Sequence, residues 1–164
     1  PIKSSAASDV YKRQGIARLF ERVLDLGCGS GILSIGALVL GCREAVGCDI
    51  DPKAPDVAMD NAALNGIGAD RFRVYAGDIL ADRGMRAALG TNFDIVLANI
   101  VADVIVALAA FVRRYLKPGG AFICSGIIKE REQDVVNALT AADYTILETK
   151  RKGEWVAMLS RRKK

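Results

Sequence analysis

Short apolar runs alternate with helix-like segments along most of this chain. The runs that predict strands are RVLDLG (22–27), EAVGCDI (44–50), FRVYAGD (72–78), FDIVLAN (93–99) and GAFICSG (120–126). Their length and their near-continuous apolar character are typical of strands that are buried on both sides. Between these runs, helices are predicted to begin near Ser30, Pro52, Asp103 and Glu130.

The helix that begins near Asp103 has the clearest periodicity. Apolar residues recur at spacings of three and four, which places them on one helical face: Val104, Leu108, Phe111, Val112, Tyr115 and Leu116. The sequence KPGG follows and is expected to end the helix.

The order of these elements predicts the fold class. Strands that alternate with helices imply β-α-β crossovers, and therefore a mostly parallel sheet with helices on both faces. The end of the chain differs, because YTILETKRKGEWVAMLS contains two strand-like runs joined at Lys152 and Gly153 without room for a helix. The prediction is an α/β, Rossmann-like sheet of seven strands with an antiparallel C-terminal hairpin.

Composition fits one globular domain. The chain has 164 residues, 51% hydrophobic and 26% charged, which is enough to bury a core. Residues 1–14, PIKSSAASDVYKRQ, have no sustained apolar period and are interpreted as a non-native or disordered lead-in, so the folded domain is expected to be 15–164. No run reaches the ~20 apolar residues of a membrane span, and a cytoplasmic monomer is expected.

The positive charge is concentrated near the C-terminus. The chain has a formal net charge of +4, and the excess consists mainly of Lys150, Arg151, Lys152, Arg161, Arg162, Lys163 and Lys164. A solvated tail and a surface that attracts an acidic partner explain this cluster equally well. No direct recognition of a nucleic-acid sequence is expected.

Cysteine and histidine usage excludes several kinds of site. Cys28, Cys42, Cys48 and Cys124 show no C-x-x-C spacing, and the chain has no histidine. A mixed zinc site and a histidine-activated nucleophile are therefore excluded, and no metal is expected. The four thiols are interpreted as reduced and buried.

The stretch VLDLGCGSGILSI is the first candidate site. Gly27, Gly29 and Gly31 directly follow the first predicted strand, where ligands bind in parallel α/β sheets. Glycines at these positions allow a tight turn and a close approach of the backbone to a ligand. Asp25, in the strand before the loop, is interpreted mainly as a residue that orients the loop, and it is included among the candidate cofactor-binding positions.

Asp49 closes the next predicted strand, about 20 residues further on. An acidic side chain there is suited to accept hydrogen bonds from both hydroxyls of a ribose. Its neighbour Ile50 is included among the cofactor-binding positions, whereas Asp51 is expected to cap a helix whose first residue is Pro52.

The glycine spacing separates two classes of nucleotide ligand. Dinucleotide-binding loops have the pattern G-x-G-x-x-G, but Ile32 stands directly after Gly31, which disfavours NAD. S-adenosylmethionine carries adenosine without phosphates and is compatible with this loop. Asp78, in YAGD, is a candidate acceptor for the adenine amine, and a turn aspartate is the alternative.

Asn99 ends the fourth predicted strand. An amide at the end of an apolar run is costly unless it is hydrogen-bonded, which favours a functional role over a capping role. Its oxygen is suited to accept a hydrogen bond from an amine and to direct the nitrogen lone pair at a methyl group. Asn99 is therefore the candidate catalytic residue.

Several motifs together resemble one known family. VLDLGCGSGILSI, GCDIDPKA, DNAALNG, FDIVLANIVADVI, LKPGG, SGI and GEWVAMLSRR resemble the class I methyltransferase domain of the PrmA family, which methylates a ribosomal protein of the large-subunit stalk base. The resemblance covers residues 22–162. It implies that Gly27, Asp49 and Asn99 contact S-adenosylmethionine, that Asn99 lies near the substrate amine, and that the product is a methylated lysine side chain or N-terminus.

The sequence also departs from that family. The family's N-terminal recognition domain, and a segment with Thr and His that helps to close over the cofactor, have no counterpart here. Three functions are therefore weighed: an active protein methyltransferase, a cofactor-binding fragment that has no activity alone, and, less favoured, an NAD-dependent oxidoreductase.

Overall fold

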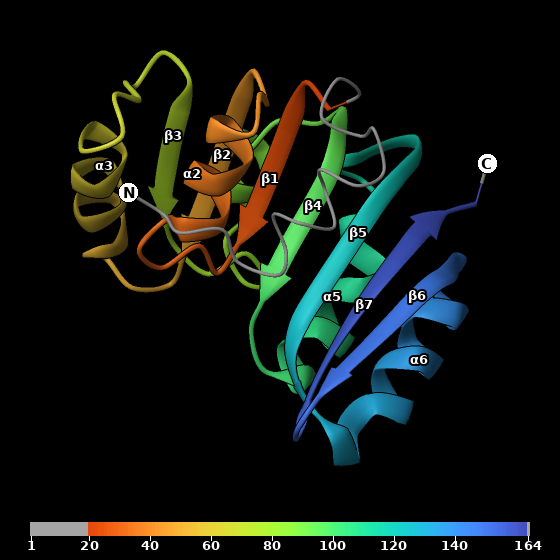
Figure 1. Ribbon diagram of the computed structural model, residues 1–164. Helices are drawn as coiled ribbons and strands as arrows, with labels where there is room; N and C mark the ends of the chain where they lie inside the picture. The colour runs from red at the N-terminus through yellow and green to blue at the C-terminus, as the bar shows by residue number, and fades with distance from the viewer. Residues whose placement is uncertain (1–19, 164) are drawn as a thin grey trace. The chain divides into compact units, whose positions relative to one another are not determined.

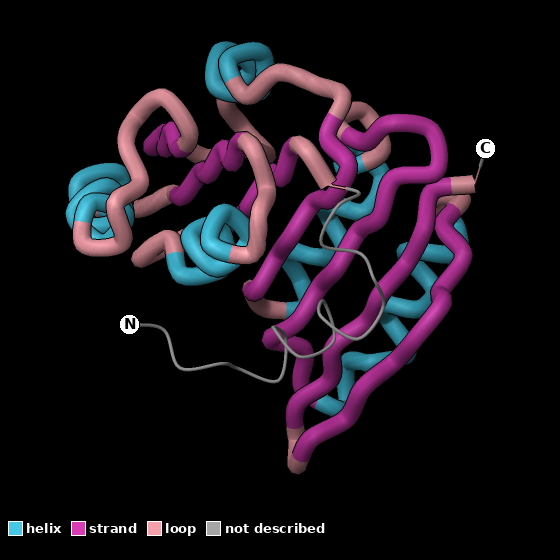
Figure 2. The backbone as a smooth tube through the Cα atoms, turned by 45° about the horizontal axis from the view of Figure 1, so that its top comes forward, coloured by secondary structure: helices cyan, strands magenta, loops and turns pink. Residues whose placement is uncertain are grey.

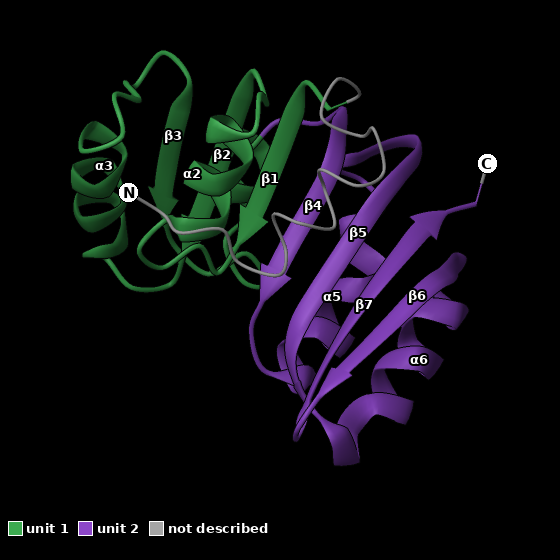
Figure 3. Ribbon diagram, in the orientation of Figure 1, with its two compact units in different colours: residues 1–89 green, residues 90–164 purple. Residues whose placement is uncertain are grey.

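A computed structural model describes residues 20–163, which form two compact units, residues 20–89 and 90–163 (Figure 3). The predicted lead-in, residues 1–14, lies outside the described residues. The first unit contains β1 (Arg22–Leu26), α2 (Ile32–Val39), β2 (Glu44–Asp49), α3 (Ala54–Ala63), β3 (Phe72–Ala76) and α4 (Arg83–Ala88). The second contains β4 (Phe93–Asn99), α5 (Ala102–Val112), β5 (Leu116–Ile128), the 3-10 turn η2 (Lys129–Arg131), α6 (Glu132–Ala141), β6 (Tyr144–Lys152) and β7 (Trp155–Arg162).

The first unit is a parallel sheet with helices packed against it. β2 is the middle strand and pairs in parallel with β1 on one side and β3 on the other. Helix α2 packs on β1 and β2, and α3 packs on β2 and β3 (Figure 1). Since β1 to β3 run in parallel, their carboxyl ends lie at the same edge, where the glycine loop begins.

The second unit combines a parallel strand pair with the predicted hairpin. β4 and β5 pair in parallel, β7 pairs antiparallel with β5, and β6 pairs antiparallel with β7. Helices α5 and α6 lie together on one face of these strands (Figures 1 and 2). Its core includes Phe122 and Tyr144, whose ring centroids are 5.9 Å apart, together with Leu139 of α6, all of them fully buried.

The predicted fold class is confirmed. The strands form a seven-stranded, mostly parallel sheet with an antiparallel C-terminal hairpin, and helices pack against it. The predicted strand 93–99 has the bounds of β4, whereas β5 is longer than predicted because it includes the KPGG sequence. The short helix α4 has no counterpart among the predicted elements.

Two helix predictions were wrong in detail. The buried face of α5 is formed by Ala102, Ile105, Leu108, Ala109 and Val112. The predicted face followed the larger side chains, but Tyr115 and Leu116 lie beyond the end of this helix and are buried there.

Helix α3 begins at Ala54 and not at Pro52, and its N-cap position is Lys53. The Asp51 carboxylate accepts a hydrogen bond from the backbone N–H of Lys53 at 2.9 Å. Asp51 therefore stabilises the turn before the helix instead of the helix end itself.

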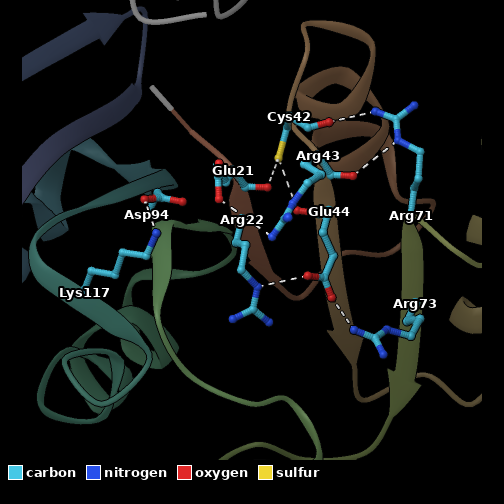
Figure 4. Close-up of polar contacts among 9 residues, drawn as sticks. All are labelled: Glu21, Arg22, Cys42, Arg43, Glu44, Arg71, Arg73, Asp94 and Lys117. Atoms are coloured by element: carbon cyan, nitrogen blue, oxygen red, sulfur yellow. Dashed lines mark hydrogen bonds and ion pairs between the residues drawn. The ribbon is translucent and has the colours of Figure 1, made fainter. Parts of the chain in front are cut away.

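Charged side chains link the amino ends of β1, β2 and β3 (Figure 4). Glu44 of β2 lies between Arg22 of β1, at 3.0 Å, and Arg73 of β3, and forms an ion pair with each. Burial raises the pKa of Glu44, but the hydrogen bonds and charges of the two arginines outweigh it, so the pKa is lowered. The three strands are thus joined by side chains at the edge opposite the glycine loop.

None of the helices within residues 20–163 has the length and the apolar character that a membrane crossing requires. The four cysteines all lie within the described residues, form no disulfide with one another and are buried, as predicted.

Candidate functional site

The glycine loop between β1 and α2 has a left-handed backbone at each of its three glycines. The φ angles are 72° at Gly27, 49° at Gly29 and 78° at Gly31, a region in which side chains cost about 1–2 kcal/mol. The carbonyl oxygen of Cys48 in β2 accepts hydrogen bonds from the N–H groups of Gly27 (2.8 Å) and Cys28 (3.0 Å). The start of the loop is therefore held against the carboxyl end of β2.

Gly29 and Gly31 have different surroundings. A Cβ atom added at Gly31 would lie 3.0 Å from Cβ of Ala58 and 3.2 Å from the ring of Phe72, so this glycine allows close packing against α3 and β3. A Cβ atom at Gly29 would meet no atom of the described residues within 4 Å. Gly31 is therefore required for packing, whereas Gly29 borders open space.

Asp49 connects the loop to the end of β2. Its Oδ2 accepts a hydrogen bond from the N–H of Gly29 at 2.8 Å, and its Oδ1 accepts one from the N–H of Asp51 at 2.9 Å. The side chain is half-buried. A carboxylate has about four acceptor sites, so capacity remains for two further donors. Ile50, the next residue, is 72% exposed.

Asp25 lies beneath the loop and is 1% exposed. Its Oδ2 accepts hydrogen bonds from the N–H of Ser34 at 3.2 Å and from the hydroxyl of Ser34 at 2.8 Å. Since Gly31, the N-cap of α2, has no side chain, Asp25 provides the acceptor for the first turn of this helix. This geometry agrees with the predicted loop-orienting role.

The pKa of Asp25 is raised to about 6. Burial is the main cause and the nearby charge of Asp49 adds to it, while the hydrogen bonds from Ser34 oppose it. Oδ1 of Asp25 is buried and has no hydrogen-bond partner among the described residues. A contact of Asp25 with a ligand stays a prediction.

Asp78 follows β3 and forms a turn. Its Oδ1 accepts a hydrogen bond from the N–H of Leu80 at 2.8 Å, and its backbone oxygen accepts one from the N–H of Asp82 at 2.7 Å. The turn interpretation of Asp78 is therefore correct. Its side chain is half-buried, and its contact with adenine stays a prediction.

Asn99 belongs to the second unit and is the last residue of β4. Asn99 is exposed, so the prediction that its amide is costly to bury was wrong. Its Oδ1 accepts a hydrogen bond from the hydroxyl of Ser125, the paired residue of β5, at 3.1 Å. The carboxamide is thus exposed but held in place.

Three residues that position the site were not identified from the sequence. Ser34 binds Asp25, Ser125 binds Asn99, and Asn61 of α3 donates a hydrogen bond to the backbone oxygen of Ser30 in the glycine loop at 3.0 Å. All three lie within the motifs quoted above for the family resemblance. The sequence pattern does not indicate which residue a hydroxyl or an amide binds, so these contacts could not be predicted.

Comparisons with known proteins agree with one another. The family model described as "Ribosomal protein L11 methyltransferase (PrmA)" matches residues 10–163. The ribosomal protein L11 methyltransferase of Agathobacter rectalis is 44% identical over 135 residues, which are 82% of this chain and 42% of that protein. The protein of the same name from Thermoanaerobacter pseudethanolicus is 42% identical over 86% of this chain and 43% of its own length. The chain therefore spans less than half the length of these curated relatives.

Solved structures show the same likeness. The ribosomal protein L11 methylase of Lactobacillus delbrueckii subsp. bulgaricus has a TM-score of 0.78 and 32% identity, over 87% of this chain and 70% of that one. An S-adenosylmethionine-dependent methyltransferase of Clostridium acetobutylicum has a TM-score of 0.74 at 15% identity, over 94% of this chain and 89% of its own. The second likeness concerns the fold alone.

Proposed function

Because the chain belongs to the PrmA family of ribosomal protein L11 methyltransferases, we propose that it is a methyltransferase domain that binds S-adenosylmethionine and methylates an amine of ribosomal protein L11. The observation that carries this proposal is the pairing of Gly29 with Asp49. The N–H of Gly29 donates a hydrogen bond to the half-buried carboxylate of Asp49 at 2.8 Å. The two residues are proposed to form the binding site for the ribose and the chain attached to it. The protein is proposed to act in the cytoplasm, where ribosomal proteins are found.

The residues of the first unit fit this cofactor. Gly29 borders open space among the described residues, so a ligand can lie against its backbone. Asp49 keeps acceptor sites for the two ribose hydroxyls after binding the N–H groups of Gly29 and Asp51. The loop has no third dinucleotide glycine, because Ile32 begins α2 directly after Gly31. This pattern supports a nucleoside without phosphates over NAD.

Asn99 is proposed to receive the amine. S-adenosylmethionine, when bound, supplies a methyl group on a sulfonium that is already activated for attack. The chain therefore contributes mainly alignment, which is worth ~7 to 11 kcal/mol in well-oriented reactions. The Asn99 oxygen accepts a hydrogen bond from the amine N–H and so fixes the direction of the nitrogen lone pair. The amine must lose a proton before attack, and water is the proposed proton acceptor.

Substitution of Asp49 tests the proposal. Asp49→Ala removes a charged acceptor, and such hydrogen bonds contribute about 1.5–3 kcal/mol, so the affinity for S-adenosylhomocysteine is expected to fall at least about tenfold. Asp51→Ala is the matched control, because this neighbouring carboxylate binds the N–H of Lys53. Calorimetric titration measures both. If Asp49→Ala binds S-adenosylhomocysteine as tightly as the wild type does, Asp49 is not part of the cofactor-binding site.

A cofactor-binding module without activity of its own is the second candidate, because the chain spans less than half the length of its curated relatives. It predicts normal affinity for S-adenosylhomocysteine together with no methylation of L11. A methylation assay with purified L11 and radiolabelled S-adenosylmethionine separates the two candidates.

A further inference from the structure

β5 contains a bulge directly opposite the end of β4. On its other side, Cys124 of β5 pairs with Met158 of β7 and Ile127 pairs with Val156, so Ser125 and Gly126 together face the single residue between these two partners. A bulge of this kind adds one residue to a strand and re-aims a side chain. Cys124 and Ile127, which flank the bulge, are both fully buried.

Ser125, the first residue of the bulge, lies beside Asn99, because the two residues are paired in the parallel register of β4 and β5. The hydroxyl of Ser125 donates a hydrogen bond to Oδ1 of Asn99 at 3.1 Å. The backbone oxygen of Ser125 accepts a hydrogen bond from the N–H of Ile100 at 3.2 Å. The side chain of Asn99 and the backbone that follows it are therefore both held by the same residue of β5.

Gly126 completes this arrangement. Its φ is +78°, and an added Cβ atom would lie 3.0 Å from Oδ1 of Asn99 and 2.9 Å from the backbone oxygen of Ile100. The carboxamide is thus bounded by Gly126 and hydrogen-bonded by Ser125. Gly119, in the same strand, has a φ of +75° but meets no atom of the described residues within 4 Å, so a left-handed glycine is not crowded in this way everywhere in β5.

We propose that the bulge formed by Ser125 and Gly126 positions the Asn99 carboxamide for the methyl acceptor. This inference rests on the proposed function, in which Asn99 receives the amine. One acceptor site of Oδ1 is occupied by Ser125, and the direction of that hydrogen bond fixes where the second acceptor site points. Ser125 is a positioning residue that acts through Asn99 and does not itself contact the amine.

The first test observes the carboxamide directly and needs no activity. In ¹⁵N-labelled protein, the side-chain NH₂ of Asn99 is expected to be ordered, and Ser125→Ala is expected to lower its order parameter and shift its signals. Ser125→Thr keeps a hydroxyl and should restore both. Ser160→Ala is the control, because this buried hydroxyl donates to the Phe122 backbone oxygen at 3.0 Å and its loss affects β5 without reaching Asn99. An unchanged Asn99 signal in Ser125→Ala overturns the proposal.

The second test is a double-mutant cycle on L11 methylation. Ser125→Ala is expected to lower kcat about two- to tenfold, the range for one hydrogen bond, with little change in the KM for S-adenosylmethionine. In the Asn99→Ala background the same substitution should have no further effect. Equal reductions in both backgrounds would show that Ser125 acts independently of Asn99, against the proposal.

Gly126 provides a third comparison. Gly126→Ala should lower kcat more than Gly119→Ala, since the two glycines have a similar positive φ and only the Cβ atom at Gly126 would crowd Asn99 and Ile100. Equal kcat values in these two variants count against the proposal. Absence of any turnover by the wild-type protein, in contrast, counts against the proposed function, and the carboxamide measurement still decides the inference about Ser125.

Discussion

Substitutions in the glycine loop can test whether Gly31 is needed for packing and Gly29 for ligand binding. Gly31→Ala introduces two costs. An alanine at φ +78° costs about 1–2 kcal/mol, and its Cβ atom would lie 3.0 Å from Ala58 and 3.2 Å from Phe72, an overpacking that costs about 1–3 kcal/mol. The free energy of unfolding is expected to fall by about 2–5 kcal/mol in total.

Gly29→Ala introduces only the backbone cost. Its Cβ atom meets no described atom within 4 Å, so about 1–2 kcal/mol of stability should be lost. Gly66→Ala is the matched control, because Gly66 also has a positive φ, +68°, with no described atom within 4 Å, and follows α3. Gly29→Ala and Gly66→Ala should therefore be equally stable, and both should be more stable than Gly31→Ala.

Ligand affinity should rank Gly29→Ala and Gly31→Ala in the opposite order. The methyl group of Gly29→Ala occupies the space proposed for the cofactor, so the affinity for S-adenosylhomocysteine should fall at least about tenfold, as for the loss of a strong contact. Gly66→Ala should bind as the wild type does, and Gly31→Ala should keep most of the affinity at temperatures where it is folded. Urea unfolding followed by circular dichroism gives the stabilities, and calorimetric titration gives the affinities.

Two results would refute this reasoning. Equal stabilities of Gly29→Ala and Gly31→Ala would mean that the contacts of Gly31 with α3 and β3 do not constrain the loop. Wild-type affinity of Gly29→Ala would mean that the ligand does not approach the loop at this glycine, whatever the stabilities are.

Three further changes test other parts of the structure. Asp25→Asn should flatten the pH dependence of stability. The pKa of Asp25 is about 6 in the folded protein against an ordinary value of 3.8, so the folded wild type binds more protons between these values and should lose about 2 kcal/mol relative to the variant as pH rises from 4 to 7. Equal pH dependences of the two proteins in urea unfolding would contradict this. Gly36→Ala, inside α2 with no described atom within 4 Å of the new Cβ, should raise the free energy of unfolding by about 0.5–1 kcal/mol, and any loss of stability in the same assay would count against it. Glu44→Gln should lower stability at pH 7, and its effect should shrink as pH falls below 4.5, because the pKa of Glu44 is lowered from that value in the folded protein and its contribution is lost as pH falls through the folded-state pKa. An effect that does not change with pH would show that the charge of Glu44 does not stabilise the fold.

The sequence predicted β1 and β4 well because these two strands are mostly buried. FDIVLAN was predicted as 93–99 and forms β4 with those bounds, and RVLDLG was predicted one residue longer than β1. The helices were harder, since the buried face of α5 depends on two alanines, Ala102 and Ala109, whose small side chains give a weak hydrophobic signal. Helix α4 was missed because its six residues, RGMRAA, are too few for a periodic pattern.

The sequence indicated which residues form the candidate site, but the contacts that hold these residues in place were predicted only in part. Asp49 was expected to bind a ribose, but its hydrogen bond to the N–H of Gly29, which fixes the loop, could not be predicted from spacing. Asn99 was chosen because a buried amide is costly, yet it is exposed and held by Ser125. Ser125 is placed there by the register between β4 and β5, which no local sequence pattern of either strand specifies.

Both ends of the glycine loop are fixed by contacts with neighbouring elements, whereas its middle residue, Gly29, borders open space. The N–H of Gly27 binds the Cys48 carbonyl oxygen, and Gly31 packs against α3 and β3, so both ends are fixed by contacts within the first unit. Gly29 is held through its N–H by Asp49, while its Cα borders open space. A side chain at Gly31 would disturb the fold, whereas one at Gly29 would fill the space left for a ligand. Gly31 is therefore required by the packing of the fold, and Gly29 is the position at which ligand binding can be removed with the smaller loss of stability.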